Sequence, residues 1–244
     1  MKSVLISGGT SGIGLATAKI LLAKGWHVAI NGRDAEKGKA ALAELNSTNV
    51  RYFPGDVTLP ADCQCLVEET VAAFGSLDGL VTSAGIYSEN LLENVTPEEI
   101  QHLFAVNVYG TIYLCRSALP HLRKKPGSIV TVSSDAGLEG NVACSIYGAT
   151  KGAVVAFTKS LALEAAPHGI RVNCVCPGDV QTPLLEKQLR DHPDTTLDEM
   201  KEHYPLYRLA TAAEVGEAIA FLLSDASSFI TAVALPVDGG LTSW

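Results

Sequence analysis

Short apolar runs typical of buried strands alternate with helix-like segments along the whole chain. The strand-like runs are Val4–Ile6, Val28–Ile30, Val50–Phe53, Leu80–Val81, Ser128–Val132, Arg171–Val175 and Ala232–Val237. Helical spacing, composition or a capping motif marks Ile13–Lys24, Glu36–Leu45, Leu66–Phe74, Thr96–Glu99, Tyr147–Ala165 and Ala213–Leu223. Apolar strands that each precede a helix form a parallel sheet covered on both faces. The alternation therefore predicts an α/β fold: one doubly wound domain over residues 1–244, with a parallel sheet of about seven strands.

The segment from residue 184 to residue 209 departs from this alternation, because it is long, polar and mixed in charge. One interpretation is a solvated excursion on the surface. In open α/β sheets, however, ligands bind beyond the carboxyl ends of the strands, and a long insertion there is typical of a lid. We therefore predict a substrate-binding lid at about 184–209.

The charge balance argues against several classes of partner. Among 244 residues, 26 acids exceed 18 bases, which gives a net charge of -8. Such a surface repels nucleic acid and anionic membranes. The chain starts without a secretory signal, and no apolar run reaches the roughly 18 residues that span a bilayer. We therefore expect a cytoplasmic protein that binds neither nucleic acid nor membrane.

The six cysteines include the close pairs Cys63/Cys65 and Cys174/Cys176. Metal sites need wider spacing and more ligands nearby. We therefore expect reduced thiols, with Cys174 and Cys176 in the core, and no metal site.

A glycine-rich turn, Ser7–Gly14, directly follows the first apolar run. A strand, a glycine turn and a helix together form the setting in which a pyrophosphate rests on a helix N-terminus. The spacing Gly8-x-x-x-Gly12-x-Gly14 is neither G-x-G-x-x-G nor a P-loop. Because a tight strand-to-helix turn also needs glycine for its own geometry, this motif alone is a weak sign of a dinucleotide site.

Tyr147 and Lys151 share one face of a predicted helix, because they are separated by four residues. A free tyrosine with a pKa of about 10 is a poor base at neutral pH. A nearby ammonium favours the phenolate and lowers that pKa, so such a tyrosine can exchange a proton with a substrate oxygen. Ser134, at the end of the fifth strand, could hydrogen-bond the same oxygen. An isolated Tyr/Lys pair at this spacing is mostly a surface pair without function. The glycine turn and Ser134 favour a catalytic role for this one.

With these motifs in order, the sequence resembles the short-chain dehydrogenase/reductase family over essentially its whole length. Its turn is similar to the family's T-G-x-x-x-G-I-G motif, with Ser7 in place of threonine, and Tyr147 and Lys151 match its Y-x-x-x-K motif. The sequence is most similar to the 3-oxoacyl-[acyl-carrier-protein] reductase branch. The resemblance implies a Rossmann fold, a nicotinamide cofactor and a homotetramer in which the segment Phe229–Gly240 packs between subunits.

The resemblance also implies roles for individual residues. The catalytic residues would be Asn107, Ser134, Tyr147 and Lys151, with Asn107 holding a water in a proton relay. The cofactor would contact Gly8, Thr10, Ser11, Gly12, Ile13, Gly14, Arg33, Asp56, Val57, Ser83, Ala84, Gly85, Tyr147, Lys151, Pro177, Gly178, Val180 and Thr182. Asp56 and Val57 would meet the adenine, and the last four would lie along the nicotinamide. One motif differs: Thr82 and Ser83 stand where the family has two asparagines.

These residues predict an oxidoreductase that transfers a hydride between a nicotinamide cofactor and a carbonyl or secondary alcohol. Tyr147 would be the acid/base, Lys151 would lower its pKa and bind the ribose, and Ser134 would orient the substrate oxygen. The alternative is a dinucleotide-binding regulator that has lost turnover. Such proteins usually lack part of the Ser/Tyr/Lys set, which is complete here. The residues expected to face the small-molecule substrate are mixed in character: Ile86, Glu89, Leu138, Glu139, Cys144 and the lid.

The choice of cofactor depends on the stretch Asn31–Asp34. NAD-binding relatives carry an acid at the end of the second strand, which binds the ribose hydroxyls and repels a 2′-phosphate. Here Asn31 and Gly32 are neutral, and Arg33 follows, whose guanidinium can form a forked contact with a phosphate. Arg33 could instead pair with Asp34 or Glu36, and Asp34 could turn to the ribose. The pattern favours NADP(H) and leaves NAD(H) possible.

Overall fold

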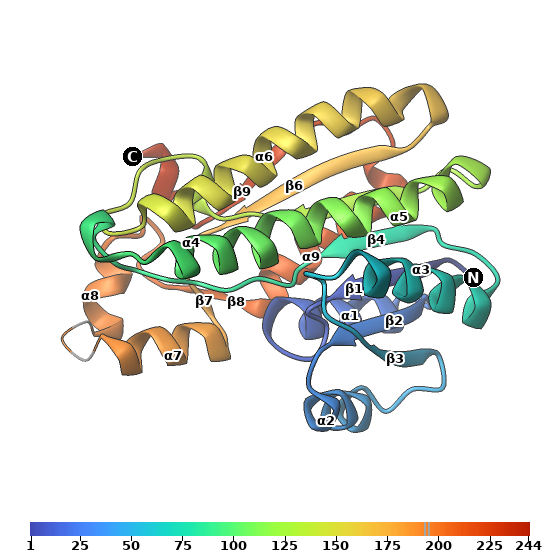
Figure 1. The fold of residues 1–244 in the computed structure, drawn as a ribbon, viewed down its shortest axis with the longest axis horizontal. Coiled ribbons are helices and arrows are strands. Elements are labelled where there is room, and N and C mark those ends of the chain that lie inside the picture. The colour runs from blue at the N-terminus through green and yellow to red at the C-terminus, as the bar shows by residue number, and fades with distance from the viewer. Residues whose placement is uncertain (193, 195) are drawn as a thin grey trace.

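Seven parallel strands form one sheet in the computed structural model, which describes residues 1–192, 194 and 196–244. The strands are β1 (Ser3–Ser7), β2 (His27–Gly32), β3 (Val50–Pro54), β4 (Gly79–Thr82), β5 (Ser128–Val132), β6 (Arg171–Pro177) and β9 (Ala234–Val237). Their order is β3-β2-β1-β4-β5-β6-β9, and all neighbouring pairs are parallel. The predicted doubly wound α/β domain is confirmed (Figure 1).

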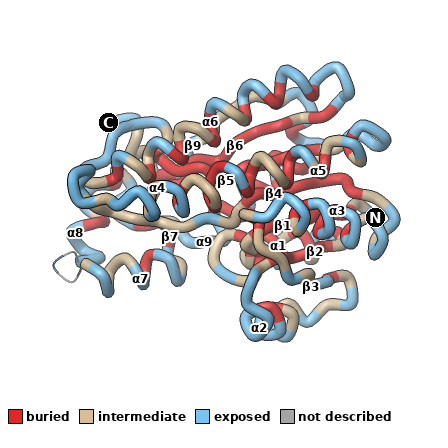
Figure 2. The backbone as a smooth tube through the Cα atoms, viewed as in Figure 1, coloured by how far each residue is buried: buried red, intermediate tan, exposed pale blue. Residues whose placement is uncertain are grey.

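Helices cover both faces of the sheet. On one face, α1 (Gly12–Ala23), α2 (Ala35–Leu45) and α9 (Ala212–Leu223) pack over apolar side chains of the central strands. On the other face lie α3 (Pro60–Phe74), α5 (Gly110–Lys124) and α6 (Ser145–Ala165). Figure 2 shows the buried residues concentrated in the sheet between these layers. Burial on both faces explains why the strands are apolar throughout rather than alternating with polar residues.

The ends of several elements differ from the sequence expectation. The last strand begins at Ala234 rather than Ala232, because Ala232 has a φ of 62°, in the left-handed region. β6 continues to Pro177, which pairs with Val237 of β9. The expected helix start at Thr96 is confirmed: Thr96 and Glu99 form a capping box on α4 (Pro97–Phe104).

A π-helical turn, Ala105–Tyr109, joins α4 to α5. Such a turn accommodates one extra residue, shifts the following side chains around the axis and occurs often at functional sites. It carries Asn107, which is buried and therefore faces the interior of the protein.

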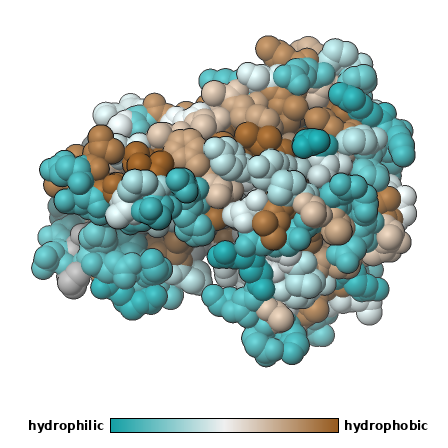
Figure 3. All heavy atoms as spheres, viewed as in Figure 1, coloured by the Kyte–Doolittle hydropathy of each residue, from teal (hydrophilic) through white to brown (hydrophobic). Residues whose placement is uncertain are grey.

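The predicted lid region contains two short helices, α7 (Pro183–Asp191) and α8 (Leu197–Glu202), between the two small strands β7 (Val180–Gln181) and β8 (Ala210–Thr211). Four of its side chains form a small apolar cluster of their own: Leu185, Met200, Tyr204 and Leu209. The outer surface around α7 is hydrophilic (Figure 3). Pro193 and Thr195, which belong to the predicted lid, lie outside the described residues.

In the part of the chain that the structure describes, no helix is both long and apolar enough to cross a bilayer. Within the same residues, no group of His, Cys, Asp and Glu side chains has the arrangement of a metal site. The six cysteines are free thiols, and only Cys65 is exposed. Cys174 and Cys176 lie buried on β6 with their sulfurs 3.9 Å apart.

Candidate active site

The order of the strands reverses between β1 and β4, which are neighbours at the centre of the sheet. Loops that leave the carboxyl ends of such strands diverge and open a crevice, the usual ligand site of open α/β sheets. Here the glycine turn leaves β1, and the loop containing Ser83–Gly85 leaves β4. A cavity of about 810 Å³ opens at this place.

Glycines in the turn allow the backbone of these two loops to touch. Gly8 has a φ of +64°, and a Cβ atom on it would lie 2.8 Å from the backbone of Ala84. A Cβ atom on Gly14 would overlap the carbonyl oxygen of Gly8. The amide of Ala84 also donates a hydrogen bond to Ser7 Oγ, at 3.2 Å. These glycines therefore hold the first turn against the loop after β4, in addition to any role in ligand binding.

The N-terminus of α1 points its first amide groups toward the cavity without a side-chain cap. Ser11 is the N-cap residue, and its side chain makes no capping hydrogen bond. Ser11, Gly12 and Ile13 line the cavity. Uncapped amides and the helix dipole together favour an anionic group such as a phosphate at this position.

Ser134, Tyr147 and Lys151 meet at the same cavity, although they come from the end of β5 and from α6. All three are buried, and Lys151 is only 6% exposed. Lys151 Nζ donates a hydrogen bond to the Val132 carbonyl at 3.2 Å and lies 5.6 Å from the centre of the Tyr147 ring. Burial lowers the pKa of Lys151 to about 8, since the ammonium has lost much of its hydration.

The pKa of Tyr147 is controlled differently from the sequence expectation. Burial raises the pKa of this phenol, a hydrogen bond from Ser134 lowers it, and the Asp135 carboxylate raises it. We expected Lys151 to lower this pKa; in the structure Ser134 has this effect, and burial outweighs it. The phenol is therefore strongly held in its protonated form.

The side chain of Asn107 is fully engaged with protein groups. Its Nδ2 donates to the Ile86 carbonyl at 3.0 Å and to Thr150 Oγ1 at 3.1 Å, and its Oδ1 accepts from the Ile86 amide at 2.9 Å. Asn107 thereby joins the π-turn, the loop after β4 and α6. Both donors of the amide are used in this way, and the role of Asn107 in a water relay stays a prediction.

At the far edge of the crevice, Arg33 is exposed and its Nη1 lies 3.6 Å from Asp56 Oδ2. The expected alternatives for Arg33, pairing with Asp34 or Glu36, are not what the structure shows. Asp34 instead caps α2, because its carboxylate accepts from the amides of Glu36 and Lys37. Asp34 is therefore committed to the helix and is not available to a ribose in this conformation.

Most of the predicted cofactor residues line the one cavity: Gly8, Ser11, Gly12, Ile13, Ser83, Ala84, Gly85, Tyr147, Lys151, Pro177, Gly178, Val180 and Thr182. Outside its lining lie Thr10, Gly14, Arg33, Asp56 and Val57, as well as Asn107 of the catalytic set. On the substrate side, Ile86, Glu89, Glu139 and Cys144 line the cavity, but Leu138 does not. Leu138 follows the short helical turn Asp135–Gly137, which leaves it 39% exposed.

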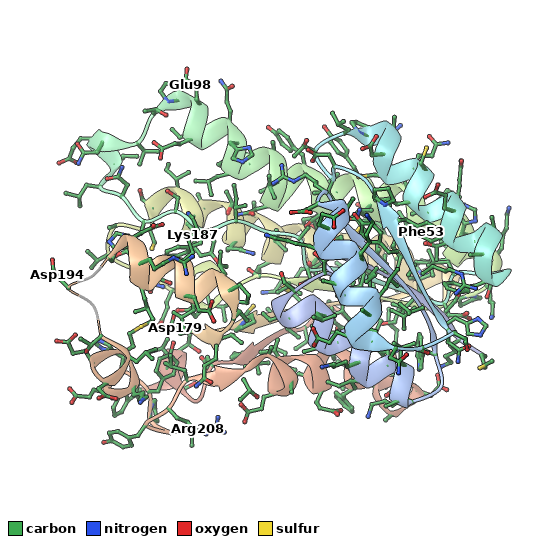
Figure 4. The ribbon with its side chains drawn as sticks, turned by 90° about the horizontal axis from the view of Figure 1, so that it is seen from below. Phe53, Glu98, Asp179, Lys187, Asp194 and Arg208 are labelled. Carbon is green, nitrogen blue, oxygen red and sulfur yellow. The ribbon has the colours of Figure 1, made fainter. Side chains whose placement is uncertain are left out.

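The sequence reasoning missed several polar residues of the cavity: Tyr87, Asp135, Asn141 and Asp179. Gln188 and Tyr204, which also line it, belong to the lid that was expected to face the substrate. Asp179 and Lys187 illustrate the arrangement, since they reach the cavity from the loop after β6 and from α7 (Figure 4). Adjacency was the one available signal for Asp135, which directly follows Ser134.

The altered motif affects hydrogen bonding at the end of β4. Thr82 Oγ1 is buried and lacks a hydrogen-bond partner; it is the only such side-chain atom among the described residues. It occupies the position of the first family asparagine, whose larger amide would reach further. The orphaned hydroxyl identifies a site that the substitution has left incompletely satisfied.

Comparisons with known proteins agree with this geometry. A family model described as "Enoyl-(Acyl carrier protein) reductase" matches residues 8–242. L-fucose dehydrogenase of Mus musculus is 41% identical over 242 residues, which cover 98% of this chain and 88% of the mouse protein. The 3-oxoacyl-[acyl-carrier-protein] reductase of Rattus norvegicus is 37% identical over 98% of both chains.

A solved structure described as ElxO with NADP bound is 35% identical, with a TM-score of 0.93 over 100% of this chain and 99% of that chain. The family model, the relatives and the solved structure thus match almost the whole chain. The chain therefore belongs to the short-chain dehydrogenase/reductase family and is an NAD(P)-dependent oxidoreductase.

Proposed function

We propose that this enzyme transfers a hydride between NADP(H) and a carbonyl or secondary alcohol, with Tyr147 as the acid/base. The observation that carries the proposal is the meeting of Ser134, Tyr147 and Lys151 in the cavity that the glycine turn also lines. When bound, the nicotinamide cofactor supplies or accepts the hydride. The protein supplies orientation and the proton.

In the reduction of a carbonyl, Tyr147 gives its phenolic proton to the substrate oxygen, which gains negative charge as the carbon is reduced. Ser134 holds that oxygen beside the phenol. The buried Lys151 ammonium, which lines the same cavity, is proposed to bind the ribose hydroxyls of the cofactor. In the proposal Asn107 anchors the geometry, because its side chain ties the loop after β4 to α6.

The cofactor residues are proposed to divide along the crevice. Uncapped amides at the start of α1 receive the pyrophosphate, and the loops at Ser83–Gly85 and Pro177–Thr182 flank the ribose and nicotinamide. Arg33 receives the 2′-phosphate, since it is exposed at the far edge and Asp34 is held in its cap. The neighbour ElxO, solved with NADP bound, supports this choice. NAD(H) remains the alternative cofactor.

The region 184–209 is proposed as the lid over the substrate. Gln188 of α7 donates hydrogen bonds to Tyr87 Oη at 3.3 Å and to Glu89 Oε2 at 3.5 Å. These contacts join α7 to the loop after β4 across the cavity. They support a closed arrangement in which the lid excludes water from the reacting atoms.

The enzyme is further proposed to be a cytoplasmic homotetramer. Large apolar side chains are exposed near β9 and the C-terminus, notably Phe229, Phe221 and Trp244. An exposed apolar surface of this kind favours association between subunits. The six free thiols fit a reducing compartment. Light scattering that gives a monomer at micromolar concentration would contradict the tetramer.

The test of the function follows nicotinamide absorbance with NADPH and NADH against a panel of ketones, aldehydes, secondary alcohols, sugars and a 3-oxoacyl thioester. L-fucose enters the panel because of the mouse relative, and the thioester because of the rat relative. We expect turnover with NADPH preferred. NADPH binding without turnover of any compound would favour the regulator instead.

Arg33→Ala tests the phosphate contact. This variant should weaken NADPH binding by about 1.5–3 kcal/mol, the range for a hydrogen bond to a charged group, and leave NADH binding almost unchanged. Calorimetry with both cofactors measures the difference. A wild-type preference for NADH, or an unchanged preference in the variant, would remove the assigned role of Arg33.

A further inference from the structure

The hydroxyl of Ser134 has one proton, and in this structure it is donated to a neighbouring carboxylate. Ser134 Oγ donates to Asp135 Oδ1 at 2.6 Å, a short distance typical of a charge-assisted hydrogen bond. The Ala136 amide donates to the same serine oxygen at 3.3 Å. Asp135 and Tyr147 therefore compete for the single hydrogen bond that the Ser134 hydroxyl can donate.

Asp135 is built into this position rather than attached loosely. It is 9% exposed, and its second oxygen, Oδ2, accepts from Asn141 Nδ2 at 3.1 Å. The Asp135 backbone carbonyl also accepts from the amides of Leu138 and Glu139. Asp135 lines the same cavity as Tyr147, and its charge raises the pKa of the phenol. One carboxylate thus contacts Ser134 directly and places a negative charge next to the phenol.

We propose that Asp135 is a positioning residue that accepts the hydrogen bond of the Ser134 hydroxyl and so favours Tyr147 as the proton donor. The inference rests on the proposed function and goes beyond it, because it concerns how the acid/base is controlled. Asp135 acts on Tyr147 in two ways that have the same sign. Its charge opposes formation of a second anion nearby, and it competes for the serine proton that would otherwise stabilise the phenolate.

Several other titratable groups also surround Tyr147. Lys151 lies on the same helix, Tyr87 stacks edge-on against the Tyr147 ring from the loop after β4, and Cys144 precedes α6. Asp179 approaches from the loop after β6, and its carboxylate accepts from Tyr204 Oη at 2.8 Å. The Glu89 carboxylate accepts a hydrogen bond from the Tyr87 hydroxyl. Asp135 differs from these groups because it accepts a hydrogen bond from Ser134, the residue whose hydroxyl also acts on Tyr147.

Asp135 should affect how the rates of reduction and oxidation depend on pH. It cannot alter the equilibrium between substrate and product, which no side chain can change. With Asp135 charged, Tyr147 remains a proton donor over a wide range of pH, which suits the reduction of a carbonyl. Oxidation of an alcohol needs the phenolate and therefore begins only at higher pH. Removing the charge should move that onset to lower pH by about one unit.

The experiment labels the tyrosines with ¹³C at the phenolic carbon and follows their resonances with pH in the ligand-free protein. The resonance of Tyr147 is identified by its absence from Tyr147→Phe. In Asp135→Asn, which keeps the shape of the side chain, Tyr147 should begin to ionise at lower pH than in the wild type. Asp135→Ser provides the same test if the asparagine variant does not fold.

Glu139→Gln is the matched control, because it removes an exposed carboxylate from the same loop. It should leave the Tyr147 resonance as in the wild type. Identical titration of Tyr147 in the wild type and the Asp135 variant would overturn the role of Asp135 and reduce it to a support for the loop. An equal shift in the Glu139 variant would also overturn it.

The pH dependence of kcat/KM for alcohol oxidation gives a second readout once a substrate is found. Its acidic limb should move to lower pH in Asp135→Asn. Because the resonance experiment needs neither substrate nor cofactor, it decides the role of Asp135 even if no turnover is found. Failure of turnover would count against the proposed function alone.

Discussion

Two buried charged groups at opposite edges of the sheet are compensated in opposite ways. Asp78, at the amino ends of the strands, and Lys151, at the carboxyl ends, are each 6% exposed. Asp78 accepts from the Ser3 amide at 2.9 Å and from Ser76 Oγ at 3.0 Å, and it pairs with Lys125 at 2.5 Å. Lys151 donates to one backbone carbonyl, that of Val132.

The pKa values follow these contacts. Burial alone would raise the pKa of Asp78, but hydrogen bonds from Lys125, Ser3 and Ser76 bring it below its usual value. For Lys151, burial dominates and lowers the pKa toward neutrality. At the amino ends of the strands the buried charge is thus compensated by protein groups, while at the carboxyl ends it is poorly compensated, as we expect of a group that binds a ligand. Variants at both ends of the strands test that distinction.

Tyr147→Phe should reduce kcat by about 10²–10⁴-fold, the usual contribution of a positioned acid/base. Cofactor affinity and unfolding free energy should change little, because the substitution removes a hydroxyl and keeps the packed ring. Steady-state kinetics and cofactor titration measure the two effects. If more than about a tenth of kcat remained, a loss below roughly 1.4 kcal/mol, Tyr147 would not be the acid/base.

Asp78→Asn should lower the free energy of unfolding by about 2–3 kcal/mol, because it replaces charge-assisted hydrogen bonds with weaker ones. Its folded-state pKa is depressed, so the stability it contributes is present above the unfolded pKa of about 3.9 and is lost as pH falls through the lower folded value. Urea denaturation at several pH values should show less acid sensitivity in the variant. The kcat of the folded variant should stay near that of the wild type. A large loss of kcat would mean that Asp78 influences the active site at the other end of the strands.

Lys151→Met should raise stability while reducing turnover and cofactor affinity. Below pH 8 the wild type bears the cost of a buried ammonium, about 3 kcal/mol from the difference between its folded and unfolded pKa values. The variant removes this cost but loses the hydrogen bond to Val132, worth about 1 kcal/mol, so we expect a net gain of about 2 kcal/mol at pH 7. The folded pKa, about 8, lies below the unfolded value of about 10.4, so this cost fades as pH rises between them. The gain should therefore shrink near pH 10.

Denaturation of both proteins at the two pH values measures this trend. A variant that is less stable than the wild type at pH 7 would mean that Lys151 is well compensated, like Asp78. Unchanged cofactor affinity would remove the ribose contact from its proposed roles.

Cys144 should give the smallest effect. Its thiol lines the cavity, 3.4 Å from Tyr87 Oη, and burial raises its pKa. Iodoacetamide should inactivate the enzyme slowly at neutral pH and faster as pH rises, and bound substrate should protect it. Cys144→Ser should remain active and resist the reagent, whereas the exposed Cys65→Ser should behave as the wild type. Inactivation that substrate does not slow would place Cys144 outside the substrate site.

The sequence predicted the strand-and-helix alternation, because strands buried on both faces leave unbroken apolar runs. It also predicted the glycine turn and the Ser/Tyr/Lys set, whose spacing is local or matches the family's motifs. It could not predict that Arg33 would meet Asp56, since the two residues come from different strand ends. The π-turn at Asn107 and the approach of Asp179 to Tyr147 depend on tertiary packing, and no local pattern signals them.

The order of the strands also bears on how the active site comes into existence during folding. β1 is paired with β4, and β6 with β9, so partners far apart in sequence must meet before the sheet is complete. Such long-range parallel pairings form slowly, because the loops between them must close first. The cavity draws on the first turn, on the loop after β4 and on Thr182. A refolding chain should therefore regain helix content well before it regains the ability to bind a nucleotide.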